Sequence, residues 1–314
     1  MRNQLPSISV IVPAYGVAHF LAEALDSLRA QDFSNWEAIV VDDGAPDDVA
    51  SVVAGFAEDP RIRLLQTDNG GIAIARNRAV PAARAPLVCL LDGDDAYKSD
   101  YLSTMIAAIE ADPALGFVTC DAWITGLRAR EGQPFSRYTP QVGPITLERV
   151  LSRAFNVFVG CTIRRSALDR VGGFDGRLRS AEDLDLWIRL LEGGWQCGYV
   201  SRPLVRYRRR SDSLSADTVG LLRGTEQGYM NAAARLAGRP EIAVIQSVLL
   251  ATRQRLSWCE AEALIRAGRP RDGVELLTAS GADRRSLRWR IAMPIMRHAP
   301  WLAPTLIDMR YWLS

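Results

Sequence analysis

The chain has 314 residues, of which 48% are hydrophobic and 24% charged, and its formal net charge is +2. This length suffices for one large domain or two smaller ones, and the composition is that of a globular protein. The net charge neither favours nor excludes a nucleic-acid partner. Lys98 is the only lysine, and His19 and His298 are the only histidines. This scarcity argues against a Walker-type loop, a Ser-His-Asp triad and a histidine-rich zinc site, so we expect chemistry based on carboxylates and arginines.

The first hundred residues alternate apolar runs with amphipathic stretches. The β-branched run 7–13 and the run 36–44 are typical of strands buried on both faces, and further strands are expected at 61–66 and 86–92. Between them, one helix carries Leu21, Leu25 and Leu28 on one face, and two more are expected over 47–58 and 72–83. This alternation predicts a parallel sheet with helices on both faces.

Acidic residues follow two of these strands. Asp42 and Asp43 end the second, whereas Asp92, Asp94 and Asp95 follow the fourth. In parallel sheets, ligands bind at the carboxyl ends of the strands, where these groups would converge. Their mutual repulsion favours a bound cation, or a ligand that carries one. The alternative is that the acids form turns and helix caps.

Residues 115–207 show a looser pattern. Strands are expected at about 116–123 and 196–207, and helices near 146–152 and 184–192. Glu182, Asp183 and Asp185 stand at the start of the last helix, where acids also interact favourably with the helix dipole. These three acids are therefore either a functional group or a helix-terminal feature.

The composition changes near residue 216 to Ala, Leu and Arg at helical spacing, which predicts a helical region over 216–314. Its tail contains Trp301, Tyr311 and Trp312 together with Arg297 and Arg310. This tail is expected either to pack on the catalytic domain or to lie on a membrane surface.

The cysteines and the apolar runs bear on the compartment. The five cysteines are widely spaced, with no C-x-x-C pair, which favours buried thiols in a reducing compartment. No run is apolar enough for a membrane span, and the first one is too short for a signal peptide. We expect a cytoplasmic protein, with the inner face of the membrane as a peripheral site.

Several segments, in this order, resemble the non-processive members of glycosyltransferase family 2. They are SVIVPAYG, LAEALDSLRAQDF, IVVDDGAPDD, NGGIAIARN, LLDGDD, GGFD, AEDLDLWIRL and YRRRSDSLS. No Q-x-x-R-W motif follows the segment AEDLDLWIRL, which argues against a processive polymerase. The resemblance implies an α/β GT-A fold with a Rossmann-like mixed sheet over residues 1–215, followed by the helical region 216–314. Within it, 1–100 would be the nucleotide-sugar-binding half and 101–215 the acceptor half.

The resemblance also implies an activity and a site. The activity is an inverting, metal-dependent hexosyl transfer from a nucleotide-diphosphate sugar, expected to be UDP-linked, to a glycan or lipid-linked acceptor. Asp183 would be the general base, with Glu182 orienting it or binding the acceptor, and Asp94 and Asp92 would hold Mn²⁺ or Mg²⁺. The nucleotide-sugar-binding residues would be Pro13, Ala14, Tyr15, Glu23, Asp42, Asp43, Arg76, Asp92, Gly93 and Asp94.

Two positions depart from the family pattern: Gly16 stands where Asn is common, and Arg210 stands where His is frequent. By analogy with the family, we expect a role in cell-envelope polysaccharide or glycolipid assembly and no nucleic-acid partner. The alternatives are a non-catalytic scaffold that binds nucleotide sugars and a sugar-phosphate nucleotidyltransferase. The loop at 13–16 lacks the Gly-rich phosphate-binding pattern of the latter and the G-x-G-x-x-G of a Rossmann dehydrogenase.

Overall fold

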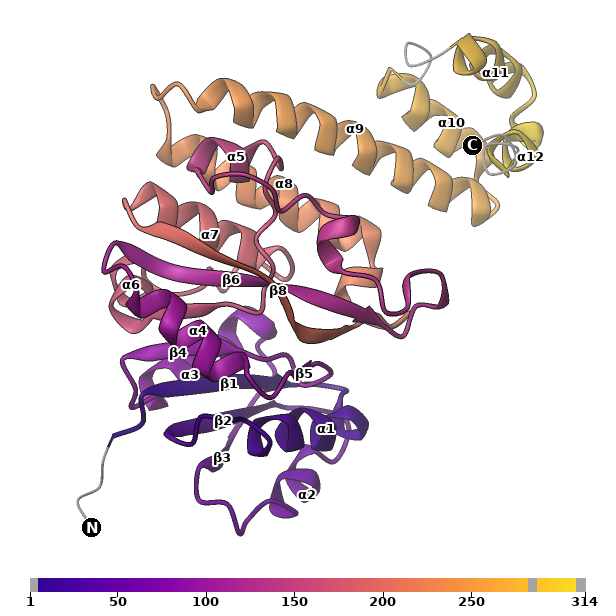
Figure 1. The fold of residues 1–314 in the computed structure, drawn as a ribbon. Helices are drawn as coiled ribbons and strands as arrows, with labels where there is room; N and C mark the ends of the chain where they lie inside the picture. The colour runs from indigo at the N-terminus through magenta and orange to yellow at the C-terminus, as the bar shows by residue number, and fades with distance from the viewer. Residues whose placement is uncertain (1–4, 282–286, 309–314) are drawn as a thin grey trace. The chain divides into compact units, whose positions relative to one another are not determined.

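The computed structural model describes residues 5–281 and 287–308 of the chain. Its internal contacts divide the chain into two units, Met1–Ala216 and Asp217–Ser314, and each is described by itself. Figure 1 shows the strands gathered in the first unit and long helices in the second.

The first unit is built on one eight-stranded sheet with the order β3-β2-β1-β4-β7-β6-β8-β5. The strands β1 to β4 are parallel to one another, as the alternating pattern predicts. Strand β7 is antiparallel to β4 and β6, and β5 is antiparallel to β8, which makes the sheet mixed. The strands are β1 (Ile8–Ala14), β2 (Trp36–Asp43), β3 (Ile62–Thr67), β4 (Leu87–Leu90), β5 (Ala96–Tyr97), β6 (Leu115–Thr125), β7 (Thr162–Arg164) and β8 (Gln196–Arg208).

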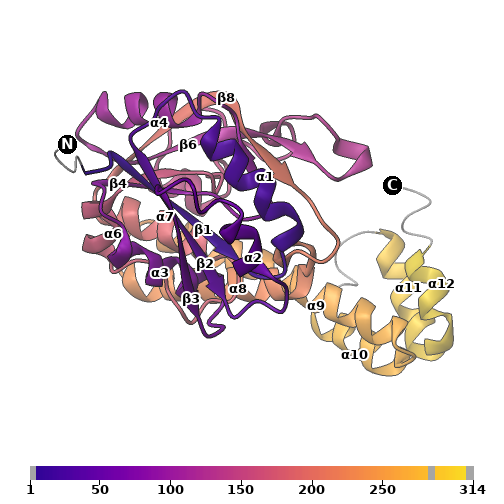
Figure 2. The same ribbon diagram turned by 90° about the horizontal axis from the view of Figure 1, so that it is seen from below.

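Seven α-helices accompany this sheet. They are α1 (Ala18–Arg29), α2 (Val49–Ala54), α3 (Ile72–Ala82), α4 (Tyr101–Glu110), α5 (Leu147–Leu151), α6 (Arg165–Val171) and α7 (Glu182–Glu192). Successive residues of a strand point to opposite faces, so Val10 joins the core with α1 and α4, and Ile11 joins the core with α3, α6 and α7. Figure 2 shows α1 and α4 on one side of the sheet and α3 and α6 on the other. Burial on both faces explains why these strands are continuous apolar runs.

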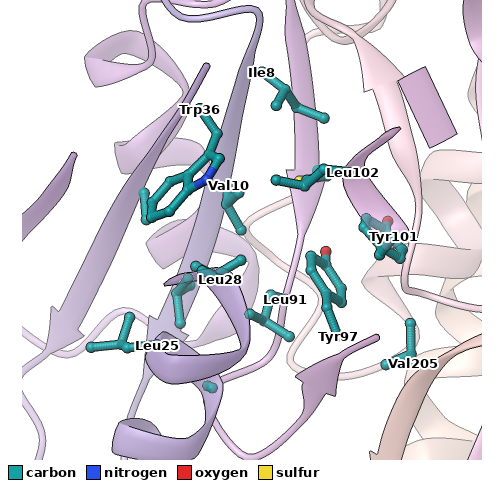
Figure 3. Packing of buried hydrophobic residues seen from close by; sticks show 14 of the residues in the cluster. Ile8, Val10, Leu25, Leu28, Trp36, Leu91, Tyr97, Tyr101, Leu102 and Val205 are labelled. Atoms are coloured by element: carbon teal, nitrogen blue, oxygen red, sulfur yellow. The ribbon is translucent and has the colours of Figure 1, made fainter. Parts of the chain in front are cut away.

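The core on the α1 side is a mixture of aliphatic and aromatic side chains. The ring of Tyr97 stacks on that of Tyr101 at a centroid distance of 3.6 Å, and its hydroxyl donates to the carbonyl of Leu90. Burying a tyrosine with its hydroxyl bonded avoids the cost of an unsatisfied polar group. Figure 3 shows the two rings beside Leu91 at the end of β4, so this packing fixes the start of the acidic loop.

The structure departs from the expected elements in several places. Helix α4, strands β5 and β7 and helix α6 were not predicted. Strands β5 and β7 have only two and three residues, too few for a periodic signal. The helix expected over 47–58 is shorter, because α2 ends at Ala54 with Gly55 as its C-cap, and hydrogen-bonded turns continue the chain.

The second unit is helical, as predicted from its composition. Helix α9 and helix α10 are joined by a tight turn and pack around Ile265 and Leu277, which are buried. The helices are α8 (Thr218–Arg235), α9 (Ile242–Arg266), α10 (Pro270–Ala279), α11 (Leu287–His298) and α12 (Ala303–Asp308), with the 3₁₀ turn η5 (Pro300–Leu302). Among residues 5–281 and 287–308, no helix is both long and apolar enough to cross a bilayer. The predicted tail residues Arg310, Tyr311 and Trp312 lie outside the described residues.

Candidate active site

Arg76 on α3 connects two acidic segments that lie far apart in the sequence. Its Nη2 donates to Oδ1 of Asp92, after β4, and its Nη1 donates to Oε1 of Glu182, at the start of α7, both at 2.7 Å. The Arg76 side chain is only 1% exposed. Arginine pairs buried in this way are strong and directional because the guanidinium presents a fixed fork of donors. The acids of the LDGDD loop and those at the start of α7 therefore belong to one site.

This placement changes the role expected for Arg76. The resemblance places Arg76 among the nucleotide-sugar-binding residues, and in the structure both of its terminal nitrogens are engaged by the chain's own carboxylates. Burial alone would lower the pKa of the guanidinium, whereas Asp92 and Glu182 raise it overall. The group thus stays charged, and it holds the two acids in place.

Asn77, the next residue on α3, makes a second connection that the sequence did not predict. Its side-chain amide donates to the carbonyl of Phe174 at 2.7 Å and accepts from the amide of Phe174 at 2.8 Å. Gly173 has a φ of 71°, and a Cβ there would lie 2.6 Å from Oδ1 of Asn77. Only glycine suits both constraints. The GGFD turn is therefore clamped to α3, and the signal available in the sequence was the Arg-Asn pair of NGGIAIARN.

The acids of the LDGDD loop have different partners. Oδ2 of Asp94 lies 3.0 Å from Nε of Arg210, whereas Asp95 is buried and accepts from the backbone amide of Arg208 at 2.8 Å. Burial and the neighbouring Asp92 raise the pKa of Asp94, and Arg210 opposes that shift. The buried carboxylate of Asp95 attaches the end of β8 to this loop.

Arginines lie beside these acids and offset part of the repulsion between them. The repulsion between the carboxylates was taken to favour a bound cation, but Arg76 and Arg210 already neutralise Asp92 and Asp94. Glu23 on α1, expected to bind the nucleotide, pairs with Arg206 at 2.8 Å and with Arg208 at 2.5 Å. These arginines offset part of the repulsion, but Asp92 still raises the pKa of Asp94, and both acids raise that of the buried Asp95.

The loop after β1 is positioned by contacts on both sides. Asp47 accepts from the amides of Gly16 at 3.1 Å and Ala18 at 2.6 Å, which caps the N-terminus of α1 from a distant part of the chain. Gly93 donates its amide to the carbonyl of Pro13 at 3.3 Å, and a Cβ there would come within 3.0 Å of the same oxygen. Ala14 is fully buried, whereas the ring of Tyr15 is 53% exposed. Of this predicted segment, Tyr15 presents the side chain that a ligand can reach.

The acids that end β2 are both held by donors of the chain. Asp43 is buried and accepts from the amides of Gly70 at 3.0 Å and Gly71 at 2.8 Å. Asp42 is more exposed and accepts from the amide of Ala45 at 3.0 Å. The resemblance places both Asp42 and Asp43 among the nucleotide-sugar-binding residues. In the structure the carboxylate of Asp43 is the less accessible of the two.

The start of α7 presents Glu182 and Asp183 through an uncommon backbone. Ala181 adopts the left-handed conformation, with a φ of 56°, which costs a non-glycine residue about 1–2 kcal/mol. Oδ1 of Asp183 accepts from the amide of Leu184 at 2.7 Å, and Asp183 is more exposed than the buried Glu182. The contact with the amide of Leu184 fixes the orientation of the Asp183 carboxylate.

The pKa values of this pair are raised. Burial raises the pKa of Glu182 to about 7; Arg76 opposes this shift and the charge of Asp183 adds to it. Burial also raises the pKa of Asp183, which Arg76, the amide of Leu184 and Arg153 partly offset. A carboxylate with a raised pKa is a stronger base than an ordinary one, so this pair suits proton transfer near neutral pH.

The residues present fit a divalent cation only in part. Within residues 5–281 and 287–308, no three His, Cys, Asp or Glu side chains gather into a metal site. Mg²⁺ commonly takes one or two carboxylates and completes its shell with substrate phosphates and water. Asp92 and Asp94 match that donor set of hard oxygens, so the site fits a cation that arrives with a phosphate-bearing ligand.

Comparisons with known proteins bear on the family and the fold. The sequence model of the family "Glycosyl transferase family 2" matches residues 9–172, just over half of the chain. The matched segment includes Arg76, Asp92 and Asp94 and ends before Glu182. A putative teichuronic acid biosynthesis glycosyltransferase of Bacillus subtilis, TuaG, is 28% identical over 221 residues, which cover 69% of this chain and 84% of TuaG. The O-antigen biosynthesis protein RfbC of Myxococcus xanthus is 30% identical over 78% of this chain, which spans only 19% of RfbC.

Two solved structures share the fold. Staphylococcus aureus TarS 1–349, in complex with UDP-GlcNAc, superposes with a TM-score of 0.66 at 19% identity, over 98% of this chain and 92% of that one. The mannosyltransferase PcManGT of Pyrobaculum calidifontis, in complex with GDP-Man and Mn²⁺, gives a TM-score of 0.61 at 21% identity, over 98% and 88%. These likenesses support the predicted GT-A architecture followed by helices.

Proposed function

This chain belongs to glycosyltransferase family 2, and from that membership and the site geometry we propose that it transfers a sugar from a nucleotide-diphosphate donor to a hydroxyl group, with inversion at the anomeric carbon. The observation that carries the proposal is the bridge made by Arg76, which joins Asp92 of the LDGDD loop to Glu182, the neighbour of Asp183. Transfer needs a site for the departing diphosphate beside a base for the acceptor, and this bridge places the two groups of acids together.

On the donor side, the loop at 13–16 and the LDGDD loop would hold the nucleotide. The exposed ring of Tyr15 is available to stack on a nucleobase. Asp94, with Asp92, would hold Mn²⁺ or Mg²⁺, and such an ion supplies Lewis-acid neutralisation of the charge on the diphosphate. Residues 1–100 would form this donor half and residues 101–215 the acceptor half.

On the acceptor side, Asp183 would take the proton of the attacking hydroxyl. Its Oδ1 is engaged by the amide of Leu184, which fixes the carboxylate and leaves Oδ2 for the proton. One base and a direct attack opposite the departing diphosphate invert the configuration. Glu182, held by Arg76, would orient Asp183 and keep negative charge beside it.

The relatives narrow the substrates that we propose. TarS was solved with UDP-GlcNAc and PcManGT with GDP-Man, so a UDP-linked sugar is the first candidate and a GDP-linked sugar the second. The names of TuaG and RfbC refer to teichuronic acid and O-antigen biosynthesis. We therefore propose a glycan or lipid-linked acceptor of the cell envelope. No disulfide joins the five cysteines, all of which lie in the described residues, and this agrees with a cytoplasmic location.

The experiment is a panel of UDP-, GDP- and dTDP-sugars, tested for slow release of the nucleotide with Mn²⁺ and with EDTA. We expect release from one donor, stimulated by Mn²⁺ and lost in Asp94→Ala. Donor binding without release or transfer in any condition would favour the scaffold alternative. Absence of binding to every donor would contradict the proposal.

We also propose a membrane contact for the helical unit. Ile291 and Ile295 lie on one face of α11 and Trp301 follows in η5; all three are exposed, Trp301 by 73%. The adjoining hollow of about 480 Å³ on this unit is lined by Arg271, Arg297 and His298, with Glu275 as its one acid, and the two arginines suit the headgroup of an anionic lipid. Cosedimentation with anionic and neutral vesicles tests this, and Ile291→Ser with Trp301→Ser should abolish binding to the anionic ones.

A further inference from the structure

Arg153 is one of two non-glycine residues that take the left-handed backbone conformation in the part of the chain that the structure describes. Its φ is 61°, and the other residue is Ala181, which stands directly before Glu182. Arg153 follows the C-cap of α5, a position where glycine is usual because a Cβ there crowds the following carbonyl oxygen. Helix α5 packs against α7. The two strained positions therefore lie at the ends of two helices that are in contact.

The neighbouring chain fixes the strained turn that carries Arg153. The amide of Asn156 donates to the carbonyl of Pro140 at 2.7 Å. The ring of Phe155 is fully buried and meets that of Tyr199 on β8 edge to face. Strained backbone persists only where its surroundings over-determine it, and it concentrates at functional sites. The turn thus presents the side chain of Arg153 from a fixed position.

The guanidinium of Arg153 is a charge without a close partner. The residue is exposed, and its side chain forms no hydrogen bond or ion pair with the described residues. Burial raises the pKa of Asp183, and the charge of Arg153 is among the effects that offset this shift. Burial raises the pKa of Asp94 too, but there Arg210 and Arg208 oppose the shift. The charge of Arg153 therefore acts on the side of the site where the proposed base lies.

The position of the base decides which substrate this charge meets. In an inverting transfer, the acceptor hydroxyl attacks the sugar on the face opposite the departing diphosphate. A cation beside Asp183 therefore faces the acceptor. Tuning of the base is the competing explanation for Arg153, but a lower pKa makes a carboxylate a weaker proton acceptor. A guanidinium does bind carboxylates and phosphates strongly, through charge-assisted bidentate hydrogen bonds.

We propose that Arg153 binds an anionic group of the acceptor, a carboxylate or a phosphate, beside the hydroxyl that Asp183 deprotonates. The inference rests on the proposed function and narrows its acceptor to one that carries negative charge near the attacking hydroxyl. It also gives a reason for an arginine where glycine would fit the backbone better. An acceptor without the anion would still reach Asp183 but would bind more weakly.

The test compares acceptor fragments that differ only in an anionic group. Binding of methyl glucuronide and of glycerol 3-phosphate to the full chain is measured by ligand-observed NMR, with methyl glucoside and glycerol as the neutral counterparts. Each fragment is titrated with and without UDP and Mn²⁺. We expect one anion to bind about five- to tenfold more tightly than its neutral counterpart. Preference for the glucuronide would identify a uronic acid, and preference for glycerol 3-phosphate a phosphate-bearing acceptor.

Three variants separate binding from folding. The preference for the anion should vanish in Arg153→Gln and persist in part in Arg153→Lys. In Arg153→Gly it should vanish while the urea midpoint rises, because glycine adopts a φ of 61° without strain. Arg170→Gln is the matched control and should keep the wild-type preference, since Arg170 is an exposed arginine of α6 without a partner among the described residues.

Two results would overturn this assignment. The first is equal binding of the anions and their neutral counterparts, or a preference that survives in Arg153→Gln. The second is a fall of the urea midpoint in Arg153→Gly, which would mean that the arginine side chain serves the fold. If the preference depends on Arg153 in a protein that binds no nucleotide sugar, the anion site stands and the proposed function fails instead.

Discussion

One charged pair from each unit of the chain illustrates a difference in burial. In the first unit, Arg76 is buried between Asp92 and Glu182, each contact at 2.7 Å. In the second unit, Arg253 pairs with Glu226 at 2.6 Å across helices α8 and α9, but its side chain is 53% exposed. Short distances alone therefore do not distinguish the pairs; burial does.

The difference in burial determines how much each ion pair contributes to stability. An exposed pair gains little because water and salt screen it. A buried pair is costly to break, because removal of one partner leaves an unpaired charge in a medium of low polarity. The first unit keeps such pairs where sugar transfer would need acids with raised pKa values, and the second unit keeps an apolar core and polar surfaces.

Replacement of Arg76 by methionine should give the largest effect on stability. Asp92 and Glu182 would lose their shared partner, and we expect the free energy of unfolding to fall by about 3–5 kcal/mol. Urea titration followed by circular dichroism measures it. Arg76→Lys retains the charge but not the fork of donors, so its loss should be smaller. Equal losses in Arg76→Met and in the exposed-pair variant Arg253→Met would break the comparison between the two units.

Replacement of Glu182 by glutamine should shift the pH dependence. As the proposed base, Asp183 must be ionised, and burial raises its pKa, so the turnover number of the wild type should rise with pH towards neutrality. The charge of Asp183 raises the pKa of Glu182, so the two carboxyls titrate together; Glu182→Gln leaves a single ionisation and should move the acid limb to lower pH. The profile of nucleotide release between pH 4.5 and 8.5 measures it. An unshifted limb would mean that the two carboxylates are not coupled.

The raised pKa of Glu182 also makes the stability of the folded protein depend on pH. Folded Glu182 has a pKa of about 7 and binds its proton more tightly than the unfolded chain, whose ordinary value is 4.5. Its stabilising contribution is thus fully present below pH 4.5 and is lost as the pH rises through about 7. Relative to Glu182→Gln, the wild type should become less stable over this window, which thermal unfolding at several pH values would detect.

Arg253→Met should give the smallest effect. Arg253 is exposed and its pair with Glu226 lies on the surface of two helices. We expect no resolvable change in the urea midpoint or in nucleotide release, since screened surface pairs contribute little. A large loss would show that the helical unit also depends on specific charges, and the contrast drawn above would fail.

Much of the fold could be predicted, because buried parallel strands have a simple pattern. The apolar runs of β1, β2 and β4 and the amphipathic face of α1 fixed the first half of the sheet. Strands β5 and β7 have too few residues to show the alternation of apolar and polar residues that marks a strand. Helix α4 did carry a signal in Leu102, Met105 and Ile106, and it was overlooked.

The site was predicted less completely, for a physical reason. The acids were visible because each follows a strand or starts a helix. Their partners were not, since Arg76 and Glu182 are 106 residues apart and only tertiary packing brings them together. The arginines that offset part of the repulsion between the acids, Arg76 and Arg210, therefore could not be placed from the sequence.

The most direct test of the account compares donor binding with turnover in Asp183→Asn. The account assigns the donor to the loops around Asp94 and the proton transfer to Asp183. It predicts that the variant binds the donor sugar nucleotide with Mn²⁺ as tightly as the wild type does, while transfer falls by about 10²–10⁴-fold. Transfer at the wild-type rate, or loss of donor binding together with transfer in a folded variant, would contradict it.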